Sequence, residues 1–152
     1  MRNQLIALTL VITVFVTGIH YTERSLNPDP SIWQVSPTFT MFNTTLRGNP
    51  EQIGVTAGAM EAGVSGLYQW YFWNQEQSLF GQPFQVMATN RKSAKQHLVF
   101  EGNIALPNRR PGMGPPRVIR TPSTFSLPTK GIWRLEAVVD GKKLGSVVVE
   151  VF

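Results

Sequence analysis

Apolar residues after Pro37 recur mainly with a period of two, which is the repeat of a β-strand. No stretch there carries an apolar stripe at the three-and-four spacing of an amphipathic helix. Short runs rich in β-branched and aromatic residues instead alternate with Gly, Pro and Asn, which favour turns. This pattern excludes a helical bundle and predicts one all-β domain over residues 38–152.

The domain is expected to be a two-sheet sandwich, since it has a common length for that architecture. Hydrophobic residues make up 42% of the sequence, which is enough for a packed core. The predicted strands are Thr38–Leu46, Gln52–Thr56, Gly66–Asn74, Pro83–Asn90, Gln96–Gly102, Ser123–Ser126, Gly131–Val139 and Leu144–Phe152.

The segment Gly66–Asn74 has the densest aromatic pattern. Successive side chains of a strand point to opposite faces, so Trp70 and Phe72 share one face while Tyr71 and Trp73 share the other. We expect Trp70 and Phe72 to lie in the core. Tyr71 and Trp73 are then predicted to cover a rim or a partly exposed face, where they are candidate binding residues.

A hairpin is predicted at the end of the chain, because Asp140-Gly141 is a strong turn signal between two alternating runs. Trp133 and Leu135 share a face in the first run, and Val147 belongs to the apolar face of the second. A two-residue turn alone would place these faces on opposite sides of the sheet. One extra residue is therefore expected, in a longer turn or in a bulge near Leu144-Gly145.

The first residues are typical of an export signal. Leu5–Ile19 carries no charge and follows a short basic start, but it would cover only about 22 Å as a helix, against about 30 Å of hydrocarbon. We therefore expect residues 1–20 to be a signal peptide or a membrane anchor helix. Residues 21–37 are polar and Pro-rich, and they are expected to form an extended linker.

Val16-Thr17-Gly18 resembles the start of a bacterial lipobox, in which a lipidated Cys comes next. Ile19 stands at that position and the sequence contains no Cys, so no thioether lipid can form. Two outcomes stay open, which are cleavage after Gly18 and retention of the segment as an anchor. Either outcome predicts an extracytoplasmic protein, secreted or anchored to the outer face of the cytoplasmic membrane.

Positive charge is concentrated in one part of the sequence. The chain has a formal net charge of +5, and the stretch Arg91–Arg120 holds seven basic residues and one acidic residue, a net charge of +6. Within it, the connection Leu106–Pro122 carries five Pro and four Arg. A local concentration of positive charge of this kind suits an anionic partner, namely a phosphate polymer, a lipid head group or an acidic protein. A solvated loop that aids solubility is the alternative. The candidate binding arginines are Arg109, Arg110, Arg117 and Arg120.

Catalytic and metal-binding patterns are not found in the sequence. Without Cys there is no disulfide and no thiolate ligand, and His20 and His97 are the only histidines. Carboxylates are sparse and scattered. We therefore expect no enzymatic activity, no metal, no cofactor and no nucleic-acid partner. We expect contact with a membrane only through the N-terminal segment, if that segment is not cleaved.

Two functions of different class remain open from the sequence. The first is a binding or adaptor module of the cell envelope that associates with anionic wall or membrane polymers. The second is a structural accessory domain that joins another envelope or membrane protein through a sheet edge.

Four segments resemble an uncharacterised domain family of secreted or lipid-anchored proteins from spore-forming Gram-positive bacteria. They are Gln69–Trp73, Leu79–Gly81, Pro122–Pro128 and the tail Gly131–Val151. The resemblance implies an immunoglobulin-like β-sandwich of about 7–8 strands outside the cytoplasm, with no assigned activity. The sequence departs from the family pattern at Tyr71, where His is expected, at Asn74, where Gly is expected, and in lacking the lipidated Cys.

Overall fold

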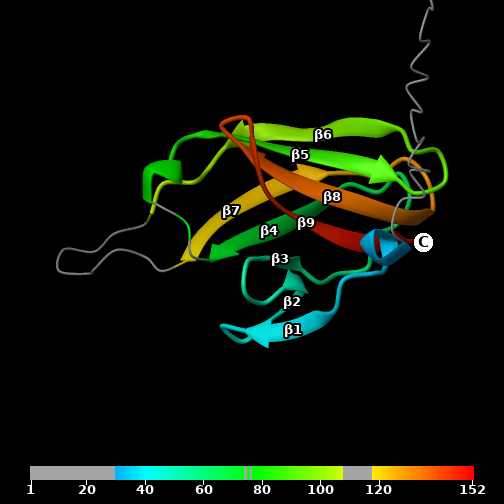
Figure 1. Ribbon diagram of the computed structural model, residues 1–152, viewed down its shortest axis with the longest axis horizontal. Helices are drawn as coiled ribbons and strands as arrows, with labels where there is room; N and C mark the ends of the chain where they lie inside the picture. The colour runs from blue at the N-terminus through cyan, green and yellow to red at the C-terminus, as the bar shows by residue number, and fades with distance from the viewer. Residues whose placement is uncertain (1–29, 74, 76, 108–117) are drawn as a thin grey trace, which may run out of the picture.

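Nine strands in two antiparallel sheets make up most of the structure (Figure 1). This computed structural model describes residues 30–73, 75, 77–107 and 118–152. The strands are β1 (Thr38–Met41), β2 (Thr44–Asn49), β3 (Ile53–Thr56), β4 (Gly66–Trp73), β5 (Pro83–Asn90), β6 (Gln96–Asn103), β7 (Val118–Phe125), β8 (Gly131–Val139) and β9 (Lys142–Val151). Two short 3-10 helices, η1 (Pro30–Trp33) and η2 (Gln77–Leu79), complete the described elements.

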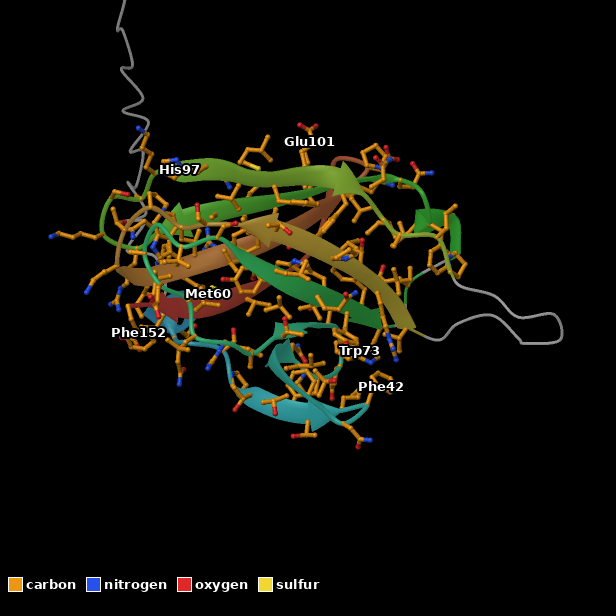
Figure 2. All side chains as sticks on the ribbon, turned by 180° about the vertical axis from the view of Figure 1, so that it is seen from behind. Phe42, Met60, Trp73, His97, Glu101 and Phe152 are labelled. Atoms are coloured by element: carbon orange, nitrogen blue, oxygen red, sulfur yellow. The ribbon has the colours of Figure 1, made fainter. Side chains whose placement is uncertain are left out.

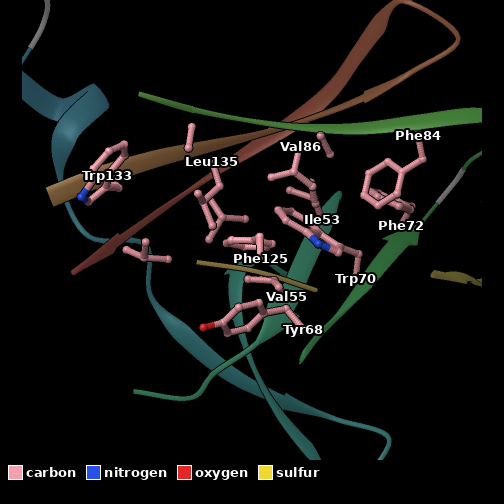
Figure 3. Close-up of a cluster of buried hydrophobic side chains, with 14 of the residues drawn as sticks. Ile53, Val55, Tyr68, Trp70, Phe72, Phe84, Val86, Phe125, Trp133 and Leu135 are labelled. Atoms are coloured by element: carbon pink, nitrogen blue, oxygen red, sulfur yellow. The ribbon is translucent and has the colours of Figure 1, made fainter. Parts of the chain in front are cut away.

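The strands form a sandwich of two layers. One sheet has the order β1-β2-β3-β4-β7, here called sheet A, and the other has the order β6-β5-β8-β9, here called sheet B. Their facing sides enclose the main core (Figures 1 and 3). The predicted all-β fold with two sheets is confirmed. The predicted signal or anchor helix lies outside the described residues, as does most of the predicted linker. Within the described part, neither helix has the length or the apolar character needed to cross a membrane.

The main core is built from the predicted inward faces. Trp70 and Phe72 of β4 are fully buried and stack with ring centroids 6.3 Å apart, and Phe84 of β5 meets both edge-on (Figure 3). Trp70 Nε1 donates a hydrogen bond to Ser123 Oγ over 2.8 Å, so its polar atom is satisfied inside the core. Burial also raises the pKa of the Tyr68 phenol, which belongs to the same core.

The C-terminal hairpin has the predicted register. Trp133 pairs with Val149 and Leu135 with Val147, so both apolar faces meet the core. The extra residue is Leu144, because Ala137 pairs with Gly145 while Val138 pairs with Lys143. The predicted bulge is therefore confirmed.

The physical role of Gly145 differs from the expected one. Its backbone φ is not in the left-handed region. A Cβ atom at this position would lie only 3.0 Å from the Ile53 side chain, which belongs to the opposite sheet. Gly145 is therefore required by close packing between the layers rather than by an unusual turn.

Residues Thr38–Leu46, predicted as one strand, form a hairpin of β1 and β2 instead. Phe42 and Asn43 occupy the turn with positive φ angles of 52° and 58°. Two successive left-handed residues are the signature of the two-residue turns that suit the twist of a hairpin. Gly usually marks such turns, so the pair Phe42-Asn43 is only a weak sequence signal for a hairpin.

Strand β7 begins at Val118, within the segment predicted to be an irregular connection. Pro122 disfavours a central strand there, since proline lacks the N–H group that a central strand needs. The structure accommodates it because β7 is an edge of sheet A, with β4 as its neighbour in that sheet. Edge strands tolerate proline where its nitrogen faces away from the neighbour.

The chain before β1 covers the edge of sheet B. Ser36 N donates to Val148 O over 3.0 Å, and Val148 N donates back to Ser36 Oγ over 2.9 Å. The Arg134 guanidinium on β8 lies 5.0 Å from the centre of the Trp33 ring. This arrangement fixes the position of η1 and protects the β9 edge from pairing with another chain.

Candidate functional site

A second, smaller hydrophobic cluster lies on the outer side of sheet A. It consists of Leu46, Tyr71 and Trp73, with Phe39 and Met41 packed against them. Tyr71 and Trp73 alternate along β4 with the core residues, so they face away from the main core, as predicted. They are only 6% and 9% exposed, however, and do not form the partly exposed rim that the sequence indicated.

The β1–β2 hairpin causes this burial. It contributes Phe39, Met41 and Leu46, which pack against the β4 aromatic residues, and Trp73 Nε1 donates to Met41 Sδ over 3.1 Å. Gly54 on β3 permits the close approach, because a Cβ there would lie 3.1 Å from ring atoms of both Phe39 and Trp73. A hairpin that the sequence did not predict thus covers the two predicted binding residues.

Phe42 is the exposed aromatic residue of this region. It stands at the tip of the β1–β2 turn, 50% exposed, and its ring lies nearly parallel to that of Tyr71 with centroids 6.3 Å apart. Figure 2 shows Phe42 and Trp73 together at one end of the molecule. A left-handed backbone is unfavourable for a bulky residue, and strain of this kind is concentrated at functional sites.

Arg120 completes a surface with these two rings. It lies on β7 directly opposite Tyr71 of β4. Its guanidinium carbon is 4.6 Å from the centre of the Phe42 ring and 5.4 Å from that of Tyr71, within the range of a cation–π interaction. We call Phe42, Tyr71 and Arg120 the aromatic–arginine surface.

Arg120 is suited to hold an anion. It is exposed, and no acidic side chain pairs with it among the residues that the structure describes. The contact with two rings restricts the guanidinium, and an arginine can form two hydrogen bonds with one phosphate or carboxylate. The surface can therefore bind an anionic group without first breaking an ion pair.

The structure brings together three of the six predicted site residues, namely Arg120, Tyr71 and Trp73. Arg109, Arg110 and Arg117 lie outside the described residues. Val118, the first described residue after them, packs against the second cluster. The chain thus leaves the basic segment directly at the aromatic–arginine surface.

Phe42 was missed by the sequence reasoning, although a signal was present. In the segment Thr38–Leu46 the apolar residues Phe39 and Met41 stand at odd positions, whereas Leu46 stands at an even one. Such a change of phase, with Asn43 between, indicates a turn.

The basic stretch does not form one surface. Arg91, Lys92 and Lys95 belong to the β5–β6 turn, whereas β6 leads from there to the opposite end of sheet B. Figure 2 shows His97, at the start of β6, far from Phe42. Arg91, Lys92 and Lys95 are therefore separated from Arg120 by the length of the domain.

The described residues contain no group of three His, Asp or Glu side chains that could hold a metal ion. His97 packs against Trp133 with ring centroids 5.9 Å apart. Glu136 accepts contacts from Arg134, Lys143 and Gln96. Packing thus explains the position of His97, and charge pairing explains that of Glu136.

Comparison with protein families matches residues 21–149 to a family described as "Domain of unknown function (DUF4871)". The chain belongs to this family. Among solved structures, the DUF4871 chain is similar to one described as a "Putative Lipoprotein from Bacillus anthracis", with a TM-score of 0.60 and 20% identity. The match covers 79% of this chain and 86% of the other, and it shows that the fold is shared. No curated protein matches the sequence.

Proposed function

We propose that this protein is an exported, non-enzymatic component of the bacterial cell envelope that binds an anionic wall polymer. In this proposal the domain is an immunoglobulin-like sandwich outside the cytoplasmic membrane, either secreted or anchored there. The aromatic–arginine surface is the binding site, and Arg109, Arg110 and Arg117 supply further cations for the same polymer.

One observation carries the proposal: Arg120 is exposed, has no acidic partner in the described residues, and is held against the rings of Phe42 and Tyr71. A cation placed in this way loses little conformational freedom when it binds an anion. Three further arginines precede it within twelve residues of sequence. A phosphate polymer presents repeated anions that match such a series of cations.

The comparisons support an envelope location without assigning a ligand. The fold is shared with a protein described as a "Putative Lipoprotein", and the first residues have the composition of an export signal. The family description gives no activity. The binding role therefore rests on the surface itself.

The test is sedimentation of the full chain with purified Gram-positive wall sacculi, with and without their phosphate polymers. Replacing Arg109, Arg110, Arg117 and Arg120 together by Ser should release the protein at moderate salt, since each exposed contact near an anionic surface contributes on the order of 1 kcal/mol. Phe42→Asn should weaken binding less. It removes the ring but keeps a residue that tolerates the left-handed backbone.

A variant with the same change of charge provides the control. Serine at Arg91, Lys92, Lys95 and Lys130 removes four cations from the opposite end and should leave wall binding close to that of the parent protein. Equal sedimentation of the parent and the loop variant would reject the proposal. Equal loss in the two quadruple variants would show that only net charge matters.

A structural accessory domain is the second candidate, favoured by one edge of the sandwich. Strand β6 is an eight-residue edge without proline, and Leu98 on it is 49% exposed. Such an edge can pair with a strand of another protein. This function predicts capture of an envelope protein that survives high salt and is lost in Leu98→Lys.

A further inference from the structure

A basic groove lies at the end of the domain opposite to the aromatic–arginine surface. It runs between the β5–β6 turn and the segment that precedes β8, and it measures about 980 Å³. Arg91 and Lys92 line one side, and Lys130 lines the other. The volume is at the upper end of the range found for ligand sites, so a phosphate head group fits within it.

Both walls of the groove are fixed by hydrogen bonds. Asn90, which is buried, accepts at Oδ1 from the backbone N–H groups of Lys92 and Ser93 over 2.9 and 3.1 Å. Arg91 N donates to Ile132 O over 2.9 Å and joins the two walls. On the other side, Trp133 Nε1 donates to Thr129 O over 2.8 Å. The cations are therefore carried on a backbone whose shape is set before any ligand binds.

Charge in the groove has one sign. Arg91, Lys92 and Lys130 line the groove, and Lys95 lies beside it in the β5–β6 turn. All four are exposed, and none of them has an acidic partner among the described residues. No Asp or Glu from the described part of the chain lines the groove. The acidic residue Glu150 lines a different depression, beside Met60 and Phe152. The groove thus favours an anion, and the uncompensated charge would be costly if a neutral surface covered it.

The chain enters the domain beside this groove. Helix η1 packs on β8 through Trp33 and Arg134, and Arg134 lies two residues after Ile132, which bonds to Arg91. Figure 1 places η1 at the same end of the molecule as the β5–β6 turn. Nine residues, 21–29, separate the predicted anchor, residues 1–20, from the start of η1 at Pro30. Even fully extended, nine residues span at most about 32 Å.

We infer that this groove binds the phosphate head groups of anionic phospholipids, so that the anchored domain lies with its entry end on the membrane. The short tether keeps the groove near the bilayer surface, where the effective concentration of head groups is high. The opposite end, with the aromatic–arginine surface, then points away from the membrane.

The experiment uses the full chain in proteoliposomes and profits from the absence of Cys in the sequence. Thr129→Cys at the groove and Leu106→Cys at the other end each provide one site for a fluorescent label. Vesicles of phosphatidylcholine alone are compared with vesicles that also contain phosphatidylglycerol, both with head-group spin labels as quencher. We expect strong quenching at residue 129 only in the anionic vesicles, and little at residue 106 in either.

Removal of the cations should abolish this quenching. Serine at Arg91, Lys92, Lys95 and Lys130 is expected to lower the affinity for the anionic surface about fivefold per residue removed. The loop variant with serine at Arg109, Arg110, Arg117 and Arg120 should be quenched like the parent protein. The loop variant is therefore expected to lose wall binding, and the groove variant is expected to lose lipid binding.

Three results would overturn the inference. One is equal quenching at residue 129 in both kinds of vesicle, and another is quenching that persists in the groove variant. The third is loss of quenching when millimolar inorganic phosphate is added, because the groove would then be a site for the free ion rather than for the lipid surface.

Discussion

Single side chains define where this domain is rigid and where it can bind. Trp133 is 1% exposed and satisfies its indole N–H at Thr129 O, so it combines a large apolar contact with one partly buried hydrogen bond. Phe42 is the opposite case, since it is half exposed on a strained backbone. The first residue serves stability, whereas the second belongs to the proposed binding surface.

Trp133→Ala should lower the free energy of unfolding by roughly 3–5 kcal/mol, because it removes a buried aromatic side chain and leaves a cavity. That loss is a large share of the stability of a small domain. Denaturant unfolding of both proteins measures it. Phe42→Ala provides the comparison at an exposed position and should cost much less, and a Trp133→Ala protein as stable as the parent would contradict the inward position of this ring.

At the scale of elements, the register of the last hairpin depends on one inserted residue. Deleting Leu144 removes the bulge and brings odd and even positions into pairing, which would turn Val147, Val149 and Val151 away from the core. We expect the deletion variant to lose cooperative unfolding, as monitored by circular dichroism during heating. Leu144→Ala keeps the residue count and should unfold cooperatively with a moderately lowered Tm. Equal Tm values would show that the register is set elsewhere.

A comparison of the predicted and observed elements shows what could be predicted from the sequence. Strands β5 and β8 have the predicted bounds, and the bulge was expected near Leu144, because alternation and the Asp140-Gly141 turn are local signals. The split of β1 from β2 was missed since its turn is built on Phe42, a residue that rarely has positive φ. Arg120 and Tyr71 were each singled out, but their contact depends on the pairing of β4 with β7, which are separated by 44 residues of sequence, and no local pattern encodes it.

For the whole molecule, export without lipidation is the consequence that can be measured most directly. Because Ile19 stands where a lipobox has Cys and the sequence contains no Cys, a fatty-acid label should not enter the protein. Metabolic labelling followed by immunoprecipitation tests this. Ile19→Cys is the matched variant, since Val16-Thr17-Gly18 before it already suits the modification. Label in the unmodified protein would show that another group is acylated.

The residues before β1 also have a mechanical consequence. If the protein is held at its N-terminal side, a pulling force on the domain first loads the contacts of Trp33 with Arg134 and of Ser36 with Val148, both of which join this segment to sheet B. The β1–β2 hairpin, which carries Phe42 and begins at Thr38, bears load only after those contacts break. The contacts of residues 30–36 thus bear the force first, and the aromatic–arginine surface keeps its shape while the N-terminal tether is under tension.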